Sequence, residues 1–257
     1  MMRIALSEIL TPGRAGRKGL PGLSLQGNRK IAFSEWSAQV VLADYFVELD
    51  PGRLFPGREE LPLELDLGCG DGRFLMEMAR AFPERNFLGV ERVKGRVHLV
   101  SERIRRSGMR NVRILRLDAG YVVGWQLSAA SVSRVHFLFP DPWPKKRHHK
   151  NRIVRSEEFL HGLGRVLKPG GEFLHKTDQE DYFLEAGAGM RVQSWAEELG
   201  WESQELGIYP ETDFERQWIC QGRSICRGRW RRGASGLDEA SQGSRPGVDG
   251  EYILLDE

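Results

Sequence analysis

The 257-residue chain has the composition of a globular protein, with 40% hydrophobic and 29% charged residues. Its formal net charge of only +2 does not by itself indicate a protein that binds nucleic acid. No stretch approaches the roughly 18 apolar residues of a membrane span, and no secretory signal is evident, so we expect a cytoplasmic protein without membrane segments. Three scattered cysteines predict free thiols rather than a disulfide framework or a zinc site.

Composition divides the chain into three parts. Residues 1–35 contain six basic and two acidic residues without a helical or strand period, which predicts a flexible basic arm. Residues 36–227 form the predicted folded domain. Residues 228–257 begin with a long stretch rich in Gly, Ser and Arg, which predicts a disordered tail.

Strand and helix patterns alternate through the predicted domain. Apolar residues with a period of two predict strands, and apolar residues at helical spacing predict helices. The predicted strands are 63–67, 86–90, 112–117, 132–139 and 172–175, and the predicted helices are 73–81, 93–106, 157–167 and 181–199. This alternation predicts an α/β fold with a doubly wound, mostly parallel sheet and helices on both faces. Ligands bind such sheets beyond the carboxyl ends of the strands.

The first predicted strand runs into the sequence DLGCGDG, where Gly68 and Gly70 allow a tight turn and the close approach of a ligand. Such a turn serves several cofactors, and three acids at matching strand ends narrow the choice. Glu91 is suited to a ribose diol, Asp118 to an adenine amino group, and Asp66 to the amino group of an amino-acid moiety. Each acid alone is as readily explained as a helix cap or turn residue. Together with the GxGxG spacing they indicate S-adenosylmethionine rather than a dinucleotide.

The most distinctive segment, FPDPWPKKRHHK, follows the fourth predicted strand. Its three prolines predict a stiff loop that holds Asp141 and Trp143 at the ligand-binding edge. Six basic residues between 145 and 155 favour contact with nucleic-acid phosphates over a merely solvated face. Trp143 either stacks on a base or covers the core below the loop. The adjacent His148 and His149 do not predict a metal site, because neighbouring residues seldom bind one ion together.

These segments closely resemble the bacterial tRNA (guanine-N7-)-methyltransferases. The resemblance spans about residues 60–216 and is carried by LDLGCGDGRFL, NFLGVE, LRLDA, FLFPDPWPKKRHHKNRIV, LKPGGEFLHKTDQEDY and TDFE. It implies a Rossmann-like class I methyltransferase fold with a seven-stranded sheet. It also implies an enzyme that uses S-adenosylmethionine to methylate N7 of guanosine 46 in the variable loop of tRNA. The residues that it implies are Asp66, Gly68, Gly70, Glu91 and Asp118 for the cofactor, Asp141 for catalysis, and Lys145, Asp178, Thr212, Asp213, Phe214 and Glu215 for the substrate.

The chain departs from this family in two places. After Arg216 it has QWICQGRSICRGRWRR instead of a glycine-containing final strand. The six arginines and two tryptophans between 216 and 232 fit RNA contact only slightly better than a divergent strand with a basic tail. Asp66 also stands where the family often has Glu, and the shorter acid shifts the expected cofactor contact.

The chemistry of this reaction agrees with the residues. Guanine N7 has a free lone pair and no proton, so alignment of donor and acceptor matters more than a strong base. A carboxylate such as Asp141 or Asp178 can accept from the N1–H and amino edge and stabilise the positive charge left by methylation. The expected partner is tRNA, without a metal, and either a monomer or a homodimer is compatible with the sequence.

Three alternatives stay open. The first is a methyltransferase that acts on another RNA, a small molecule or a protein. The second is a nucleotide-binding or RNA-binding module without catalysis. The third, more distant, is a dehydrogenase.

Overall fold

The computed structural model describes residues 37–42, 44–46, 48–201, 207–233 and 252–253. The predicted basic arm at 1–35 lies outside these residues, and so does most of the predicted tail.

Nine strands in the described part of the chain form one sheet. They are β1 (Gln39–Leu42), β2 (Leu63–Leu67), β3 (Asn86–Glu91), β4 (Val112–Arg116), β5 (Val132–Leu138), β6 (Leu167–Thr177), β7 (Ala196–Leu199), β8 (Cys226–Arg232) and β9 (Tyr252–Ile253). Their order is β7-β8-β6-β5-β2-β3-β4-β1-β9. Strand β8 is antiparallel to β6 and β7, and β9 is antiparallel to β1, whereas the other pairs are parallel. The predicted count of seven strands is therefore wrong, because β1 and β9 extend the sheet beyond β4.

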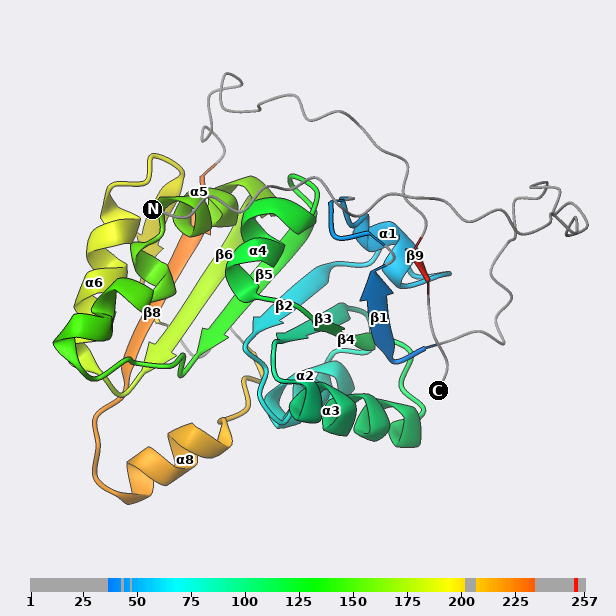
Figure 1. Ribbon diagram of the computed structural model, residues 1–257, viewed down its shortest axis with the longest axis horizontal. Coiled ribbons are helices and arrows are strands. Elements are labelled where there is room, and N and C mark those ends of the chain that lie inside the picture. The colour runs from blue at the N-terminus through cyan, green and yellow to red at the C-terminus, as the bar shows by residue number, and fades with distance from the viewer. Residues whose placement is uncertain (1–36, 43, 47, 202–206, 234–251, 254–257) are drawn as a thin grey trace, which may run out of the picture. The chain divides into compact units, whose positions relative to one another are not determined.

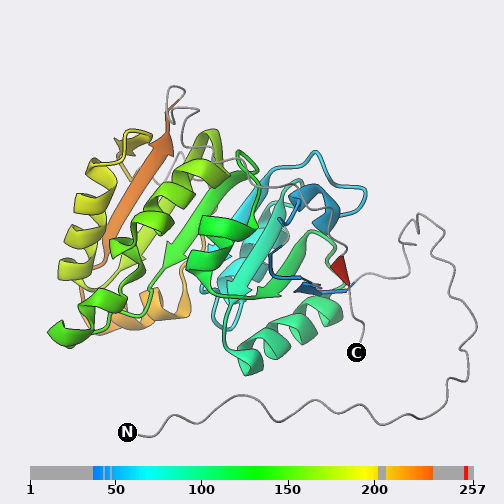
Figure 2. The same cartoon turned by 45° about the horizontal axis from the view of Figure 1, so that its top comes forward.

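Helices cover both faces of the sheet, as predicted (Figures 1 and 2). The α-helices are α1 (Pro51–Leu54), α2 (Arg73–Ala81), α3 (Lys94–Ser107), α4 (Ala119–Tyr121), α5 (Glu157–Val166), α6 (Glu180–Arg191) and α8 (Asp213–Cys220). Shorter turns are the π-helix η1 (Val122–Gln126) and the 3-10 helices η2 (Lys146–Asn151) and η3 (Ile153–Arg155).

Each face of the sheet has its own hydrophobic core. On one face, Leu75 of α2 and Val100 of α3 pack with Phe87 of β3. On the other face, Leu163 of α5 belongs to the cluster that contains Leu88 of β3. Phe87 and Leu88 serve opposite faces because successive side chains of a strand alternate. The fold is thus a three-layer arrangement around a sheet that is buried on both sides.

The predicted helix at 181–199 is too long. Helix α6 ends at Arg191, and Ala196–Leu199 instead forms the edge strand β7 against β8. The indole of Trp195, which is 2% exposed, lies against Gly164 of α5, where even a Cβ atom would stand 2.4 Å from the ring. Burial of this ring draws the chain back to the sheet, an effect that helical periodicity does not reveal.

The predicted strand at 172–175 is too short, because β6 begins at Leu167. Leu167 pairs with Val132 and Glu172 pairs with Arg134, so the residues between Leu167 and Glu172 bulge out of the ladder. Gly170 within this bulge has φ 78°. The Pro-Gly-Gly turn therefore interrupts the strand without ending it.

The prediction that residues 228–257 form a disordered tail is wrong where the structure describes them. Residues 228–232 belong to β8, which lies between β7 and β6 in the sheet, and residues 252–253 form β9. Trp230 is 1% exposed and stacks on Phe173 at 5.7 Å between ring centroids. Arg229 donates to Glu172, so a buried acid compensates the positive charge of this arginine within the sheet. The domain accordingly extends past residue 227.

The strand order reverses between β2 and β5. The chain runs from β2 through β3 to β4 on one side of β2, then crosses to β5 and β6 on the other side. In such sheets, ligands bind outside the carboxyl ends of the strands where this reversal occurs. Helix α8 lies beyond the arrowheads of β5 and β6 (Figure 1).

Candidate active site

The glycine turn after β2 keeps its outer side open. Gly68 and Gly70 have φ values of 75° and 59°, in the left-handed region that favours glycine. The amides of Gly68 and Cys69 both donate to the carbonyl oxygen of Val90, which fixes the turn to the end of β3. A Cβ atom on Gly68 would meet nothing within 4 Å, and one on Gly70 only the Gly68 carbonyl oxygen at 4.0 Å. Backbone conformation requires these glycines, and the space above them is free for a ligand.

Two carboxylates are buried side by side below this turn. Asp66 of β2 and Glu91 at the end of β3 are 4% and 5% exposed. Glu91 accepts a hydrogen bond from the Val93 amide at 2.9 Å and lies 3.5 Å from the Arg96 guanidinium. Among the described residues, no donor reaches the Asp66 carboxylate. Burial, together with the Glu91 carboxylate, raises the pKa of Asp66 to about 7. This pair is suited to a ligand that brings a cationic amino group and hydroxyl donors.

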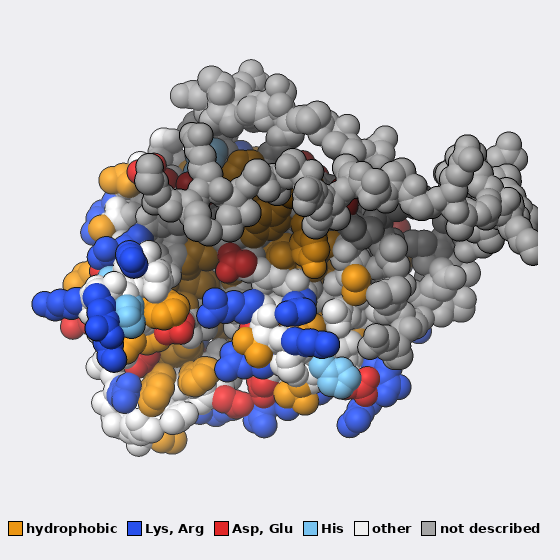
Figure 3. Space-filling model, in the orientation of Figure 1, with side chains coloured by type: hydrophobic (Ala, Val, Ile, Leu, Met, Phe, Trp, Pro, Cys, Tyr) orange, Lys and Arg blue, Asp and Glu red, His pale blue; other side chains and the backbone are white. Residues whose placement is uncertain are grey.

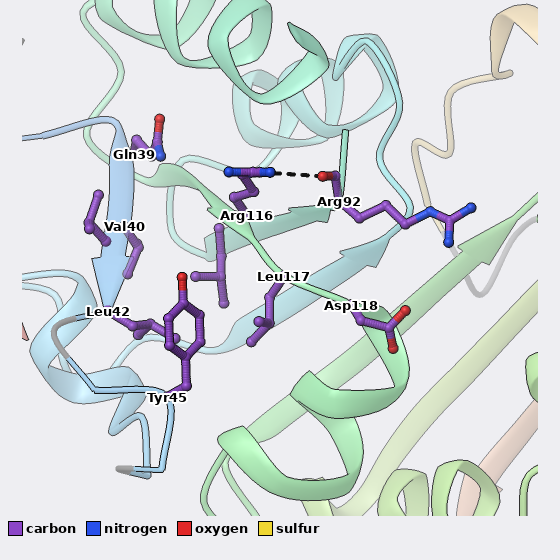
Figure 4. Close-up of a pocket in the computed structure, with 10 residues that line it drawn as sticks. Gln39, Val40, Leu42, Tyr45, Arg92, Arg116, Leu117 and Asp118 are labelled. Atoms are coloured by element: carbon purple, nitrogen blue, oxygen red, sulfur yellow. Dashed lines mark hydrogen bonds between the residues drawn. The ribbon is translucent and has the colours of Figure 1, made fainter. Parts of the chain in front are cut away.

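Asp118 lies after β4, beyond the end of the neighbouring strand. Its Oδ1 accepts from the amides of Gly120 and Tyr121 at 2.9 and 3.2 Å, so the residue does cap α4. Within the described part of the chain, no donor reaches Oδ2. A pocket of about 400 Å³ between β1 and the ends of β3 and β4 includes Asp118, Leu117 and Arg92 in its lining. Figure 4 shows Asp118 and Arg92 on the side of this pocket away from β1. Asp118 can therefore cap a helix and accept from a ligand.

The loop after β5 combines an exposed acid with a strained backbone. Asp141 is exposed, and its Oδ1 accepts from the Trp143 amide at 3.2 Å. Phe139 and Trp143 have φ values of 51° and 47°, which non-glycine residues rarely adopt. Such strain persists only where the surrounding structure enforces it, and it is common at functional sites.

Arg152 is the residue that enforces the shape of this loop. It is 2% exposed, its Nε donates to the Pro142 carbonyl oxygen at 2.9 Å, and its Nη2 donates to Asp181 of α6 at 2.8 Å. The guanidinium carbon also lies 5.0 Å from the centre of the Tyr182 ring. The sequence predicts Arg152 as one of six phosphate-binding cations, whereas the structure shows a buried anchor.

The remaining basic residues of this run divide between structure and surface. Arg155 is paired with Glu185 at 2.8 Å. Lys145, Lys146, Arg147 and Lys150 are exposed, and none forms an ion pair with a described residue. Figure 3 shows Lys and Arg side chains gathered at the left edge of the view, where the segment after β5 lies in Figure 1. Four cations thus remain available to an anionic partner.

Helix α8 is fixed by three of its predicted substrate-binding residues. The Thr212 hydroxyl accepts from the Glu215 amide at 3.0 Å and caps the helix. Glu215 is 1% exposed and pairs with Lys176 at 2.6 Å and with Arg227 at 2.9 Å. Asp213 pairs with Arg73, the first residue of α2, at 3.1 Å. These contacts are intramolecular and join α8 to β6 and to the glycine turn.

Phe214 and Asp178, two further members of the predicted substrate set, differ in exposure, and only 10% of the Asp178 side chain is accessible. Phe214 of α8 is 53% exposed. Asp178 follows β6, and its Oδ2 accepts from Arg223 at 2.8 Å and from Gln179 at 2.6 Å. The sequence does not predict this arginine contact.

Sequence patterns also give no sign of a buried network behind the site. The Tyr209 hydroxyl lies 2.9 Å from His136 Nδ1, and His136 Nε2 lies 2.8 Å from Glu64. Burial opposes the ionisation of Glu64, but the hydrogen bond from His136 and the nearby arginines outweigh it and lower the pKa of Glu64 to about 2. The network ties the segment before α8 to β5 and β2. Tyr209 lies in an irregular segment, where no periodicity marks it.

Comparison with known proteins agrees with this geometry. The family model Methyltransf_4, which describes a methyltransferase, matches residues 60–227. A tRNA (guanine-N(7)-)-methyltransferase of Nitrosococcus oceani is 37% identical over 65% of this chain and 70% of its own length. The corresponding protein of Marinobacter nauticus is 33% identical over 81% of this chain and 86% of its own. The chain belongs to the tRNA (guanine-N7-)-methyltransferase family.

The predicted fold class is confirmed. The crystal structure of the 16S rRNA methyltransferase KamB matches with a TM-score of 0.50 at 18% identity, over 70% of this chain and 93% of that one. In the part of the chain that the structure describes, no helix is long and apolar enough to cross a membrane. Nor do three or more His, Cys, Asp or Glu side chains there gather in a group that could hold a metal ion.

S-adenosylmethionine is the cofactor of a methyltransferase of this family, and the site fits it. The cofactor carries a sulfonium and an ammonium, both cations. Asp66 and Glu91 provide buried negative charge, and Arg96, at the protein surface, is the only described residue that forms an ion pair with either acid. The open glycine turn lies directly beside them.

We expect Asp66→Asn to stabilise the unliganded protein at pH 8. In the folded protein the pKa of Asp66 is about 7, above its ordinary value of 3.8, so stability falls as the pH rises between these values. That difference in pKa corresponds to about 4 kcal/mol of unfolding free energy at pH 8, which a neutral amide does not lose. Urea unfolding at pH 5 and pH 8 measures the effect. Glu60→Gln, at an exposed carboxylate, is the control, and an equal pH dependence in wild type and Asp66→Asn would contradict the expectation.

Proposed function

We propose that the protein transfers the methyl group of S-adenosylmethionine to N7 of guanosine 46 in the variable loop of tRNA, in the cytoplasm. The observation that carries the proposal is the meeting, at one edge of the sheet, of buried acids, a stiff acidic loop and unpaired surface cations. Relatives that are 33–37% identical to this chain are named tRNA (guanine-N(7)-)-methyltransferases. That name supports the choice of tRNA over the other substrates compatible with the sequence.

The three acids at the strand ends divide the cofactor among them. Asp66 accepts from the ammonium of the methionine moiety, because its carboxylate has no donor among the described residues. Glu91 accepts from the ribose hydroxyls with the oxygen that does not hold the Val93 amide. Asp118 accepts from the adenine amino group through Oδ2, next to the pocket of Figure 4. When bound, the cofactor supplies an electrophilic methyl group on its sulfonium.

Catalysis then rests on placing the guanine base. N7 attacks with its own lone pair, so the protein has no proton to remove from it, and alignment supplies much of the acceleration. Asp141 is rigidly held by the Arg152 anchor on Pro142 and presents a negative charge beside the reacting edge. This charge stabilises the positive ring that forms as the methyl group moves. The base must leave its stack to reach this edge.

Phosphate contacts come from the exposed part of the basic run. Lys145, Lys146, Arg147 and Lys150 provide affinity and register without selecting a base. Arg152 and Arg155 do not contribute, since both are already paired with acids of α6.

The direct test is methyl transfer to an unmodified tRNA transcript, followed by chemical chain cleavage specific for 7-methylguanosine. Cleavage at the single variable-loop guanosine is the expected result. Label on another base would support a methyltransferase activity but show that the target base is a different one. No transfer to tRNA by a protein that binds S-adenosylmethionine would contradict the proposal.

We expect Asp141→Ala to reduce methyl transfer at least 100-fold, as expected when a group that stabilises transition-state charge is removed. Its carboxylate bonds only within its own loop among the described residues, so cofactor affinity should change by less than a few-fold. Single-turnover transfer and calorimetric titration of the cofactor measure the two quantities. Loss of cofactor binding in this variant would refute the role given to Asp141.

Replacement of Lys145, Lys146 and Arg147 together by Ala should weaken tRNA binding and flatten its salt dependence. Each phosphate contact contributes about 0.9 to the slope of log K against log salt on a duplex, so the slope should fall by about 2 to 3. The matched control replaces Arg105 and Arg106 of α3, which are paired with Glu102. An unchanged slope of log K against log salt in the loop variant would contradict the assignment of these residues to phosphate binding.

A further inference from the structure

Residues 217–232, where the sequence departs from that of the family, lie in two different environments. Arg229 and Trp230 are buried in β8, and Arg231 pairs with Glu197 of β7 at 2.9 Å. This half of the segment is structural. Trp218 and Arg223, by contrast, lie at the end of α8 beside Asp178.

A local turn places Arg223 over Trp218. Helix α8 ends at Cys220, and Gly222 adopts φ 72°, in the left-handed region that commonly terminates a helix. The Arg223 amide then donates to the Trp218 carbonyl oxygen at 2.9 Å. The guanidinium carbon of Arg223 consequently lies 4.1 Å from the centre of the Trp218 ring, a stacking distance.

The same guanidinium also pairs with Asp178, which follows β6. Arg223 Nη1 donates to Asp178 Oδ2 at 2.8 Å, and Gln179 donates to the same oxygen at 2.6 Å. A carboxylate oxygen has two lone pairs, so Oδ2 is fully used. A ligand that needs both oxygens of Asp178 must therefore displace Arg223.

Guanine presents the same chemical group as Arg223. Its N1–H and 2-amino group are joined through one carbon, as the nitrogens of a guanidinium are, and they point two donors along one edge of a plane. A guanine on Asp178 would donate twice to the carboxylate while its ring lay on the Trp218 face. Trp218 also belongs to a row of rings, because it stacks on Phe214 at 6.3 Å and Phe214 lies 6.4 Å from Phe139.

We propose that Arg223 is a stand-in for the substrate base: in the free protein its guanidinium holds the place on Asp178 and Trp218 that the target guanine takes in the complex. Trp218 is thereby a stacking residue for the target base. Arg223 keeps the acid paired until RNA arrives, and the incoming base exchanges with it. This inference rests on the proposed function and names the residues that recognise the base.

The first test compares Trp218→Ala with Trp218→Phe in steady-state transfer to tRNA. Stacking of a base on an aromatic ring is worth roughly 1–3 kcal/mol, so kcat/KM for tRNA should fall about 10-fold or more in Trp218→Ala. The Phe variant should recover most of this loss. Cofactor affinity, which shows that the site is folded, should stay at the wild-type value in both. Trp125→Ala, at a half-exposed tryptophan of η1, is the matched control and should not change transfer.

The second test is Arg223→Ala. An exposed ion pair is worth up to about 1 kcal/mol, so removal of the competing guanidinium should lower KM for tRNA by up to about fivefold. If Arg223 instead binds an RNA phosphate, its loss in Arg223→Ala should raise KM for tRNA and flatten the salt dependence of binding.

The third test removes one donor from the base. A tRNA with inosine at the target position lacks the 2-amino group, and wild type should transfer to it less efficiently than to guanosine. Asp178→Asn should abolish most of this preference.

The outcomes separate the inference from the proposed function. If wild type does not methylate guanine N7 in tRNA, the function itself fails. If wild type does so but Trp218→Ala behaves as Trp125→Ala, or Arg223→Ala raises KM, the function stands and the stand-in is refuted.

Discussion

Two buried carboxylates without an equal number of buried cations are the constraint around which this site is arranged. Asp66 and Glu91 are almost inaccessible to water, and desolvation raises the pKa of Asp66 to about 7. Burial of an unpaired charge destabilises a fold, so such a pair is informative about a ligand. On the proposed assignment, a cationic cofactor bound over Gly68 and Gly70 would supply positive charge to this pair. On this proposal, the protein gives up stability at these two acids and gains affinity for the cofactor.

The residues that build the walls of the substrate side follow the opposite rule, because their charges are paired. Arg152 fixes the loop of Asp141, Lys176 and Arg227 fix Glu215, and Tyr209 is tied to His136. These contacts hold the loop after β5 and helix α8 as rigid walls beyond the strand ends. Preorganisation of this kind suits a reaction in which alignment contributes more than proton transfer. Lys145, Lys146 and Lys150 are exposed and form no ion pair with a described residue, as the proposed contact with phosphates requires.

Much of the sheet half around β2 could be predicted from the sequence, because local pattern and fold agree there. Strand β2 and helix α2 lie where periodicity places them, and the glycine turn between them has the expected left-handed backbone. The acids Asp66, Glu91 and Asp118 follow from their positions at strand ends. A parallel sheet brings such ends to one edge, so their proximity needs no further information.

The other half was less predictable because tertiary contacts decide it. Strand β8 is rich in arginine, a composition that does not predict a buried strand. Its arginines are accommodated because acids of neighbouring strands, such as Glu172, pair with them. Arg152 has the sequence context of a phosphate-binding residue, yet its burial depends on α6. The contact of Arg223 with Asp178 joins residues 45 positions apart. No periodicity encodes such a contact, although the unusual sequence after Arg216 does mark the segment.

The most direct test of this account is a calorimetric measurement of the protons exchanged when S-adenosylmethionine binds. Titration at pH 6.5 in buffers of different ionisation enthalpy gives the number of protons released. Because the pKa of Asp66 is about 7, the Asp66 carboxyl group is protonated in most protein molecules at this pH. Pairing with the cofactor ammonium lowers that pKa, so wild type should release more than half a proton per site, and Asp66→Asn, titrated to saturation, should release clearly less. Equal release by the two proteins would show that Asp66 does not hold the cofactor's positive charge, which would contradict the account.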